Sequence, residues 1–391
     1  MKLNLGLIAL SVGAFGIGVT EFAPMGLLPV IATDLGVSIP VAGLLISAYA
    51  LGVMIGAPLM TLTTGRVPRR TLLIALAGIF TLGNLLAAVS TDYGMFLVAR
   101  IVTSLNHGAF FGVGSIVAAS LVPPERRAGA VAAMFMGLTI ANVVGVPLAT
   151  WGGEHLGWRM AFWGIAGLGI LTMVALRLTL PALPAPKSGN ALAELRALRR
   201  GPVLGALALT VVGSSAMFTV FTYIAPILRE ATHASLGFVT AMLVTYGVGM
   251  TVGNWLGGRF ADRSVDRTLI VTLGGLTAIL IAFALLMPFI APTPIIIFLW
   301  GVASFALVPP LQVRVMSAAV DAPNLASSVN IGAFNLGNAI GAALGGAVIA
   351  SGLGYPAVAL AGAATSAIGL VAVLIAVRGA PVPDDRQLCG T

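Results

Sequence analysis

The sequence has few charged residues and almost no cysteine. Only 8% of its 391 residues are charged and 59% are hydrophobic, whereas a soluble globular chain carries roughly 25% charged residues. A water-soluble protein of this size could not bury so much apolar surface. The single cysteine, Cys389, excludes an internal disulfide framework.

Patterns that predict catalysis are also missing from the sequence. No cluster of histidine, cysteine and carboxylate residues has the spacing of metal ligands, and no combination of serine, histidine and aspartate predicts a catalytic triad. A Walker loop is absent, which argues against ATP as the energy source. We therefore expect no metal, no cofactor and no enzymatic activity.

What the sequence does contain is a series of long apolar runs. Each is long enough for the ~20 residues that a membrane-spanning helix needs, and the ~10-residue alternating segments of an outer-membrane barrel are absent. The first run reads as a retained span and not as a signal peptide, because Glu21 interrupts it and further spans follow. The predicted fold is an all-α membrane protein with twelve transmembrane helices, near 5–31, 40–64, 71–91, 94–121, 128–152, 159–180, 203–228, 236–261, 268–290, 294–318, 325–351 and 355–378.

The basic residues are distributed unevenly about these spans. Of the 20 lysines and arginines, all but Arg100, Arg159 and Arg229 fall on the side that holds both termini. Cytoplasmic loops carry such an excess of basic residues. We therefore expect a multi-pass protein of the bacterial inner membrane with both termini in the cytoplasm. The net charge of +8 then reflects the membrane topology, and it does not indicate a nucleic-acid partner.

The chain divides near its middle into two halves that repeat each other. The stretch "YALGVMIGAPLMTLTTGRVPRRTLL" from Tyr49 matches "YGVGMTVGNWLGGRFADRSVDRTLI" from Tyr246, 197 positions later. Two six-helix halves related in this way place a substrate site between them, and rocking about that site alternates access. The expected parts are an N-terminal half (1–180), a cytoplasmic linker (181–202), a C-terminal half (203–378) and a cytoplasmic tail (379–391).

Three stretches resemble motifs of a known family. The loop "GGRFADRSVDR" (257–267) resembles the Gly-x-x-x-Asp-Arg-x-x-x-Arg motif of the major facilitator superfamily. "ARIVTSLNHGAFFG" (99–112) is similar to its fourth-span arginine motif, and "GLTIANVVGVPLATWGG" (137–153) to its fifth-span antiporter motif. The whole chain resembles the drug:proton antiporter branch, and in particular bacterial arabinose-efflux-type inner-membrane permeases. The resemblance implies a proton-coupled transporter.

Glu21 is an acidic residue inside the first predicted span. A charge at the bilayer centre costs on the order of 3 kcal/mol, so such residues usually face a cavity or a partner. At helical rise, Glu21 lies about 12–15 Å and Arg100 about 9 Å from the outer ends of their spans. We expect the two side chains to approach each other or to share a water. We interpret Glu21 as a proton carrier that Arg100 tunes, with a fixed structural pair as the alternative.

The internal repeat favours a functional role for this pair. At the same offset Glu21 corresponds to Phe218 and Arg100 to Ile297, so the charged pair belongs to the first half only. The resemblance supports the same roles, because a first-span carboxylate and a fourth-span arginine are typical of the branch. His107 stands two helical turns after Arg100, and histidine can titrate near neutral pH. We expect it to serve protons or substrate, with a hydrogen-bonded packing residue as the alternative.

Aromatic and amide side chains inside the spans are the candidate substrate ligands. Such a lining suits an uncharged or amphipathic small solute. The alternative for each aromatic residue is packing or anchoring at the lipid interface. The candidates are Phe15, Asn106, Asn142, Phe218, Phe221, Tyr223, Trp300, Asn335 and Asn338.

The loop residues of the repeat are the candidate gate. We expect Asp262, with Arg263 and Arg267, to form a cytoplasmic latch opposite Arg66 and Arg70, since a carboxylate there can pair with basic groups across the halves. The first copy of the loop has no matching acidic residue, and a plain topogenic basic loop is the alternative.

Two residues of the fifth span are the remaining gating candidates. Gly145 and Pro147 lie where the two halves should slide, and glycines in spans let helices approach closely and bend. Tight packing is the alternative.

Taken together, these patterns predict a monomer that exports a small organic solute, sugar-like or drug-like, in exchange for protons. An importing symporter or a uniporter is the runner-up. A receptor or an intramembrane enzyme is disfavoured, because the sequence shows neither a sensor domain nor a catalytic cluster. The identity of the cargo is left open.

Overall fold

The computed structural model describes residues 4–64, 66–123, 127–182, 198–320 and 323–378. The regular elements in this part of the chain are helices, and they form twelve continuous helical segments that are long and apolar enough to cross a membrane, which confirms the predicted fold class. Most of the predicted linker and the whole predicted tail lie outside the described residues. The helices are α1 Leu5–Gly26, α2 Leu28–Asp34, α3 Ile39–Thr63, α4 Arg69–Ala88, α5 Tyr93–Ser120, α6 Arg127–Ile140, α7 Val146–Leu156, α8 Trp158–Thr179, α10 Gly201–Phe221, α11 Ile224–Pro226, α12 Leu236–Ala261, α13 Val265–Leu286, α14 Thr293–Ala306, α15 Val308–Ala318, α16 Pro323–Ala350 and α17 Gly354–Arg378, with π-helical segments η2 Ala141–Gly145 and η3 Ile227–Ala231.

The helices of the first and seventh spans end earlier than hydropathy predicts. The first span was expected to reach residue 31 and the seventh residue 228, but α1 ends at Gly26 and α10 ends at Phe221. Pro29 and Pro226 follow these ends at equivalent places in the repeat. Proline has no N–H to donate and clashes with the preceding turn, so neither helix continues unbroken through its proline: Pro29 stands in the first turn of α2, and Pro226 is the last residue of α11.

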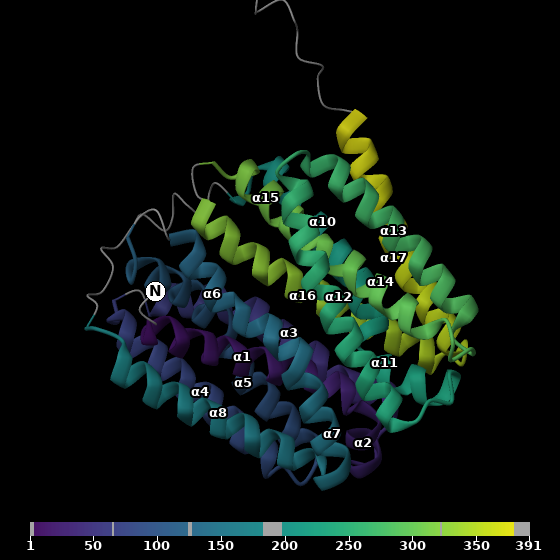
Figure 1. The fold of residues 1–391 in the computed structure, drawn as a ribbon, viewed down its shortest axis with the longest axis horizontal. Coiled ribbons are helices and arrows are strands. Elements are labelled where there is room, and N and C mark those ends of the chain that lie inside the picture. Colours follow the sequence, from purple (N-terminus) through teal and green to yellow (C-terminus); the bar gives the residue numbers. More distant parts are fainter. Residues whose placement is uncertain (1–3, 65, 124–126, 183–197, 321–322, 379–391) are drawn as a thin grey trace, which may run out of the picture.

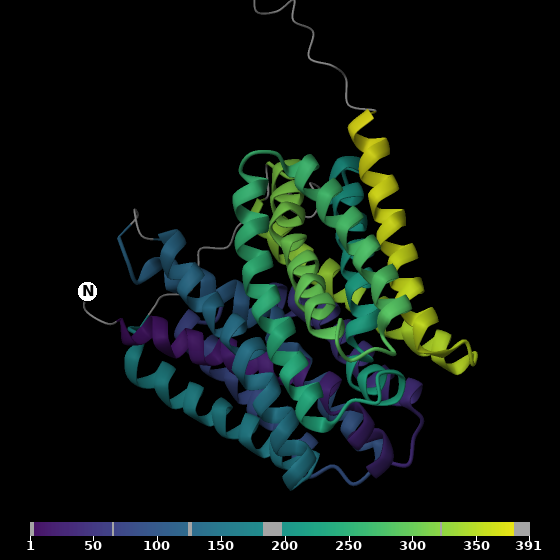
Figure 2. The same cartoon turned by 45° about the vertical axis from the view of Figure 1, so that its right-hand side comes forward.

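The helices form two groups, one before and one after the middle of the chain. Figures 1 and 2 show α1 to α8 in one group and α10 to α17 in the other. The two groups converge at the end that carries α2, α7 and α11, and they diverge at the end where α1 and α16 begin. By the distribution of basic residues, the converging end is the outer one.

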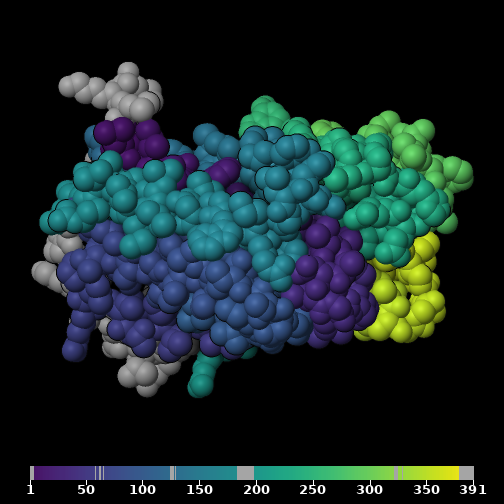
Figure 3. Space-filling view, turned by 90° about the horizontal axis from the view of Figure 1, so that it is seen from below, coloured from purple at the N-terminus to yellow at the C-terminus, as the bar shows by residue number. Residues whose placement is uncertain are grey.

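An apolar core joins the groups at the outer end. It combines Phe22 and Met25 of α1 and Leu28 of α2 with Phe218 and Phe221 of α10. In the space-filling view of Figure 3, the purple segment that includes α2 lies against the C-terminal half. A second core belongs to the N-terminal half alone. The outer end is therefore sealed by buried side chains from both halves.

Glycine permits the closest approaches between the halves. A Cβ atom on Gly247 of α12 would lie 2.5 Å from the carbonyl oxygen of Asn142 in η2. A Cβ atom on Gly43 of α3 would lie 2.2 Å from the hydroxyl oxygen of Tyr223. A larger side chain would collide at either point. The halves therefore approach each other through two backbones at Gly247, and through a backbone and the Tyr223 ring at Gly43.

Candidate functional site

Glu21 lies in the interior of the N-terminal half, with only 4% of the residue exposed. His107 of α5 lies beside it, with its Nδ1 4.0 Å from Oε2 of the glutamate. The same Nδ1 is 3.0 Å from the hydroxyl oxygen of Tyr49 on α3, and the two atoms share a hydrogen bond. Three helices therefore bring a carboxyl, an imidazole and a phenol into one buried cluster.

Arg100 belongs to this cluster, but its partner is the backbone of α1. Its Nη1 donates a hydrogen bond to the carbonyl oxygen of Thr20 at 2.7 Å, and its guanidinium carbon lies 4.1 Å from the centre of the Tyr49 ring. Among the described residues no carboxylate oxygen lies within 4.0 Å of this guanidinium. Arg100 and Glu21 thus share a site without an ion pair in contact.

Pro24 explains why the backbone of Thr20 is available to a side chain. In a regular helix the carbonyl oxygen of residue 20 accepts from the N–H of residue 24. Residue 24 is proline and has no N–H, so the oxygen is left free inside the protein. A buried carbonyl needs a donor, and Arg100 supplies it.

Asn84 holds the same point of α1 from the other side. The hydroxyl of Thr20 donates to Oδ1 of Asn84 at 2.6 Å, and Nδ2 of Asn84 donates to the carbonyl oxygen of Phe80 at 2.8 Å. The turn before Glu21 is therefore fixed by both α4 and α5. Two nitrogens of Arg100, Nε and Nη2, have no hydrogen-bond partner among the described residues.

Sequence reasoning missed Tyr49 as a member of this site. The signal was present, because Tyr49 begins the first copy of the repeat and Tyr246 begins the second. A tyrosine at the same register in both halves indicates a shared role, and inside a membrane protein the phenol hydroxyl needs a polar partner.

A cavity of about 170 Å³ lies between the halves, on the cytoplasmic side of the outer seal. Of the expected substrate ligands, Asn142 is the one that lines it. None of the described residues that line it is charged. The lining residues are Phe135, Leu138, Thr139, Asn142, Gly247, Met250, Thr251, Asn254, Phe305 and Val308.

Two other expected ligands from the N-terminal half lie elsewhere. Phe15 lines a surface groove between α1 and α6, together with the exposed Met136 and Ile140. Asn106 faces a small space inside the N-terminal half, beside Phe80 and Phe110, and its Nδ2 donates to the carbonyl oxygen of Thr103. Neither side chain borders the cavity between the halves.

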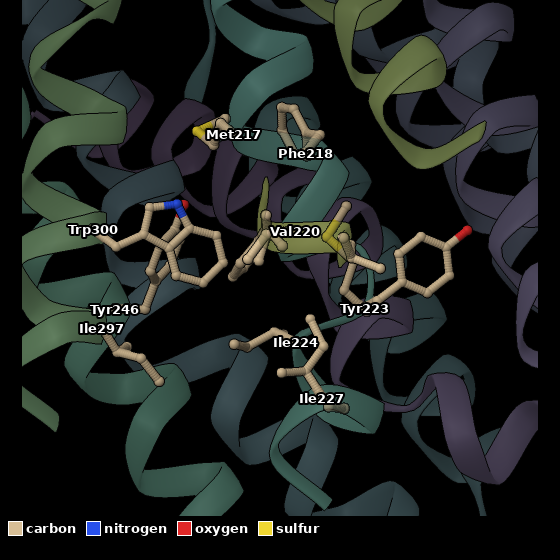
Figure 4. Close-up of a cluster of buried hydrophobic side chains, with 14 of the residues drawn as sticks. Met217, Phe218, Val220, Tyr223, Ile224, Ile227, Tyr246, Ile297 and Trp300 are labelled. Carbon is tan, nitrogen blue, oxygen red and sulfur yellow. The ribbon is translucent and has the colours of Figure 1, made fainter. Parts of the chain in front are cut away.

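The aromatic candidates of the C-terminal half form one buried cluster (Figure 4). Phe221 stacks on Tyr246 with ring centres 4.3 Å apart, and Tyr246 lies 4.8 Å from Trp300. Phe218 reaches across to Phe22 of α1 with ring centres 6.2 Å apart. One side of this aromatic cluster therefore forms part of the outer seal, and Trp300 lies on its other side.

The remaining candidates of this half are Tyr223, which hydrogen-bonds to α16, and Asn335 and Asn338, which belong to α16. The hydroxyl of Tyr223 donates to the carbonyl oxygen of Ala342 at 2.7 Å. Oδ1 of Asn335, and both Nδ2 and Oδ1 of Asn338, have no hydrogen-bond partner among the described residues.

The expected gate residues stay within their own halves in this structure. Arg66 and Asp262 are exposed, and Arg70 donates to the carbonyl oxygen of Arg177 in its own half. The ion pair that the structure places near the second loop joins Arg314 of α15 to Asp266, with 2.5 Å between Nη1 and Oδ1. Arg263 and Arg267 line a groove of about 340 Å³ on the C-terminal half.

Two polar contacts cross between the halves in the described part of the chain, both missed by sequence reasoning. Nη1 of Arg229 in η3 lies 3.3 Å from Oε1 of Glu154 in α7 at the outer end. The hydroxyl of Ser47 in α3 donates to the carbonyl oxygen of Ala339 in α16 at 3.1 Å. Both join residues far apart in sequence, so no local pattern could have paired them.

The expected hinge residues of the fifth span lie at a change of helix type. Gly145 ends the π-helical segment η2, and Pro147 stands in the first turn of α7. A π-helical turn widens the helix by one residue, and such turns are frequent at functional positions.

A family model and several curated relatives match nearly the whole chain, and all of them indicate a membrane transporter. Residues 10–329 match the family model of the Major Facilitator Superfamily. The inner membrane transport protein YdhP of Escherichia coli strain K12 is 56% identical, over 97% of this chain and 98% of its own length. A chloramphenicol resistance protein of Streptomyces lividans is 34% identical, over 91% and 90%. A probable sugar efflux transporter of Pasteurella multocida is 30% identical, over 94% and 91%.

A solved structure shares the fold of this chain. It is a bacterial homologue of the human lysosomal transporter Spinster, in an inward-facing and unoccupied conformation. The TM-score is 0.67 at 15% sequence identity, over 97% of this chain and 96% of the other. At this identity the likeness concerns the fold alone.

Proposed function

Because this chain belongs to the major facilitator superfamily, we propose that it is a monomeric, proton-coupled exporter of small organic solutes. It is a multi-pass transporter of the inner membrane and not an enzyme. Export is supported by relatives named as a chloramphenicol resistance protein and as probable sugar efflux transporters. The proposed cargo is accordingly a sugar-like or drug-like molecule.

The position of Glu21 carries the proposal of proton coupling. It is buried, no arginine or lysine among the described residues lies within 4.0 Å of it, and it lies 4.0 Å from the one imidazole of the cluster. Removing a carboxylate from water is costly unless its charge is compensated, whereas the neutral acid is tolerated. A change in hydration around Glu21 therefore changes its preference for a proton. When the halves rock, the direction of opening sets that hydration.

Alternating access is supported by the asymmetry between the two ends. The outer end is closed by the apolar core around Phe22 and by the pair between Glu154 and Arg229. The cavity lies on the opposite side of this seal. We propose that Asp262 and the basic residues of the loops meet across the halves in the other state, and that Gly145 and Pro147 let the fifth span bend between the two.

The test is solute-driven proton movement in everted membrane vesicles. Respiration acidifies the vesicle interior, and a pH-sensitive dye reports proton release when amphenicols or glycosides from a panel are added outside. We expect solute-dependent proton release with the wild type and none with Glu21→Gln. Glu230→Gln is the matched control, because this exposed glutamate lies outside the predicted site, and it should behave as wild type.

Other outcomes would contradict the proposal in distinct ways. If Glu21→Gln accumulates solute and releases protons as well as wild type does, Glu21 is not the carrier. A proton symporter would move protons in the same direction as the solute, and a uniporter would leave the dye signal unchanged. Either signal would refute antiport.

A further inference from the structure

A groove of about 340 Å³ runs along the start of α13 in the C-terminal half. Arg263, Ser264 and Arg267 line its polar end, and Phe260 of α12 and Val271 of α13 line its apolar end. Val271 lies about 10 Å along the helix from Ser264. The groove therefore extends from the loop between α12 and α13, on the cytoplasmic side, into the membrane-spanning part of α13.

The apolar end of the groove is open to the bilayer. Val271 is 71% exposed and Phe260 is 45% exposed. Inside a bilayer, exposed apolar side chains contact lipid tails, which are as apolar as leucine. A molecule in the groove can therefore keep an apolar part in the lipid while a polar part lies at the loop.

The polar end of the groove has two positive charges without a counter-ion. In the described part of the chain, no carboxylate oxygen lies within 4.0 Å of the guanidinium of Arg263 or Arg267. The acidic residue between them in sequence, Asp266, is paired with Arg314. None of the described residues that line the groove is acidic. The polar end therefore favours an anion.

The internal repeat shows that the first half uses the matching groups differently. Arg70 corresponds to Arg267, and its guanidinium donates to the carbonyl oxygen of Arg177 in α8. Arg267 bonds to Ser264 through its backbone N–H, and its guanidinium has no hydrogen bond to another described residue. Ser264 also stands where the first half has the apolar Val67. The donors that the first half uses internally, or lacks, are thus available in the second.

Ser264 adds a neutral donor to the two arginines. It is the N-cap of α13, and its oxygen accepts from the N–H of Arg267 at 3.3 Å. A hydroxyl can accept and donate at once, so its O–H is left to donate. The positive end of the helix dipole of α13 lies at the same place and also favours negative charge.

We infer that this groove binds an acidic phospholipid of the cytoplasmic leaflet, with the phosphate at the two arginines and Ser264 and the start of an acyl chain along Phe260 and Val271. Guanidinium groups match the oxygens of a phosphate, and basic pockets between membrane helices on the cytoplasmic side suit acidic head groups. A zwitterionic head group fits less well, because its ammonium would lie beside two arginines with no acid in the described lining. The inference does not depend on the direction or the coupling of transport.

Lipid titration of the full-length protein in detergent tests the inference. Native mass spectrometry gives the Kd of the first bound lipid, with phosphatidylglycerol and phosphatidylethanolamine as probes. Wild type should bind phosphatidylglycerol at least fivefold more tightly. Arg263→Gln combined with Arg267→Gln should raise the Kd for phosphatidylglycerol about fivefold or more, as expected for two partly exposed charge contacts. The matched control is Arg66→Gln combined with Arg70→Gln, which removes the same charge from the equivalent loop of the first half and should leave this Kd unchanged.

Several results would overturn the inference. Equal affinity for the two lipids, or an unchanged Kd in the double variant, would exclude a site for acidic lipid at these arginines. An equal loss in the control would show that the total charge of the cytoplasmic side, and not the groove, holds the lipid. Displacement of phosphatidylglycerol by sn-glycerol 3-phosphate would indicate a site for free phosphate. Should the double variant aggregate, Arg267→Gln alone makes the same test, and an unchanged Kd there counts against the inference.

Discussion

Arg100 and Pro24 are predicted to be coupled energetically through the carbonyl oxygen of Thr20. Arg100→Gln removes a charged hydrogen bond of 2.7 Å and a guanidinium 4.1 Å from a tyrosine ring. The hydrogen bond contributes about 1.5–3 kcal/mol and the cation–π contact about 1–2 kcal/mol. Two unpaired nitrogens leave the interior with the same change, so we expect a net loss of about 2–4 kcal/mol in the free energy of unfolding.

Pro24→Ala should lower this loss, because it returns an N–H to the helix. The restored N–H can bond to the oxygen of Thr20, which then no longer depends on Arg100. We expect Arg100→Gln to cost about 1–2 kcal/mol less in the Pro24→Ala background than in wild type. Transport should not be restored, because the cation beside Glu21 is still missing.

A double-mutant cycle measures this coupling. The wild type, both single variants and the double variant are unfolded by denaturing detergent in mixed micelles, and the four free energies are compared. Pro147→Ala is the control, since it adds an N–H to another helix, and the loss caused by Arg100→Gln should be the same in that background. If the Arg100 and Pro24 changes add to within about 0.3–0.5 kcal/mol, the backbone bond is not what holds Arg100.

Three further predictions concern other contacts. Tyr49→Phe removes the hydroxyl 3.0 Å from the imidazole and should reduce solute-driven proton release about fivefold, as expected for one buried hydrogen bond; unchanged release would exclude a role for that hydroxyl. Glu154→Gln breaks the pair with Arg229 and should shift the population two- to fivefold toward the outward-open state, given about 0.5–1 kcal/mol for a partly exposed pair; spin-label distances across the outer end report the shift, and exchanging the two charges should reverse it. Hydrogen bonds from the indole of Trp158 and from Arg159 lower the pKa of Asp34 below its ordinary value of 3.8. The ionised carboxylate therefore stabilises the fold above pH 3.8, and this stabilisation is lost as the pH falls through the lowered pKa. Asp34→Asn should make the melting temperature depend less on pH at the acid end of a thermal unfolding series, and a dependence as steep as that of wild type would contradict the assignment.

The twelve spans could be predicted because hydropathy depends on composition over about 20 residues and not on neighbours in space. The ends of two spans could not be placed by the same average. Shortly before Pro29 and Pro226 the chain stays apolar while the helices end, at Gly26 and at Phe221. A missing N–H decides the boundary there, and hydropathy does not register it.

Glu21, Arg100 and His107 of the candidate site were predictable, but Tyr49 and the contacts among the side chains were not. Depth along the helices brought Glu21 and Arg100 to similar levels, but the rotation of α5 decides that Arg100 meets a backbone oxygen. Pro24 was visible in the sequence, and the oxygen that it frees could have been deduced from spacing alone. The pair between Glu154 and Arg229 joins helices of different halves, so only the tertiary packing reveals it.

The acidic residue and part of the outer seal are consecutive in the chain. Phe22 follows Glu21 directly, and its ring lies 6.2 Å from Phe218 and 6.1 Å from Phe221 in the opposite half. Any movement of α1 that withdraws this ring also admits water beside the carboxyl. Under the proposed function, the barrier against passive proton leakage and the exit for cargo are one structure, and we expect the membrane to remain impermeable to protons until the transporter turns over.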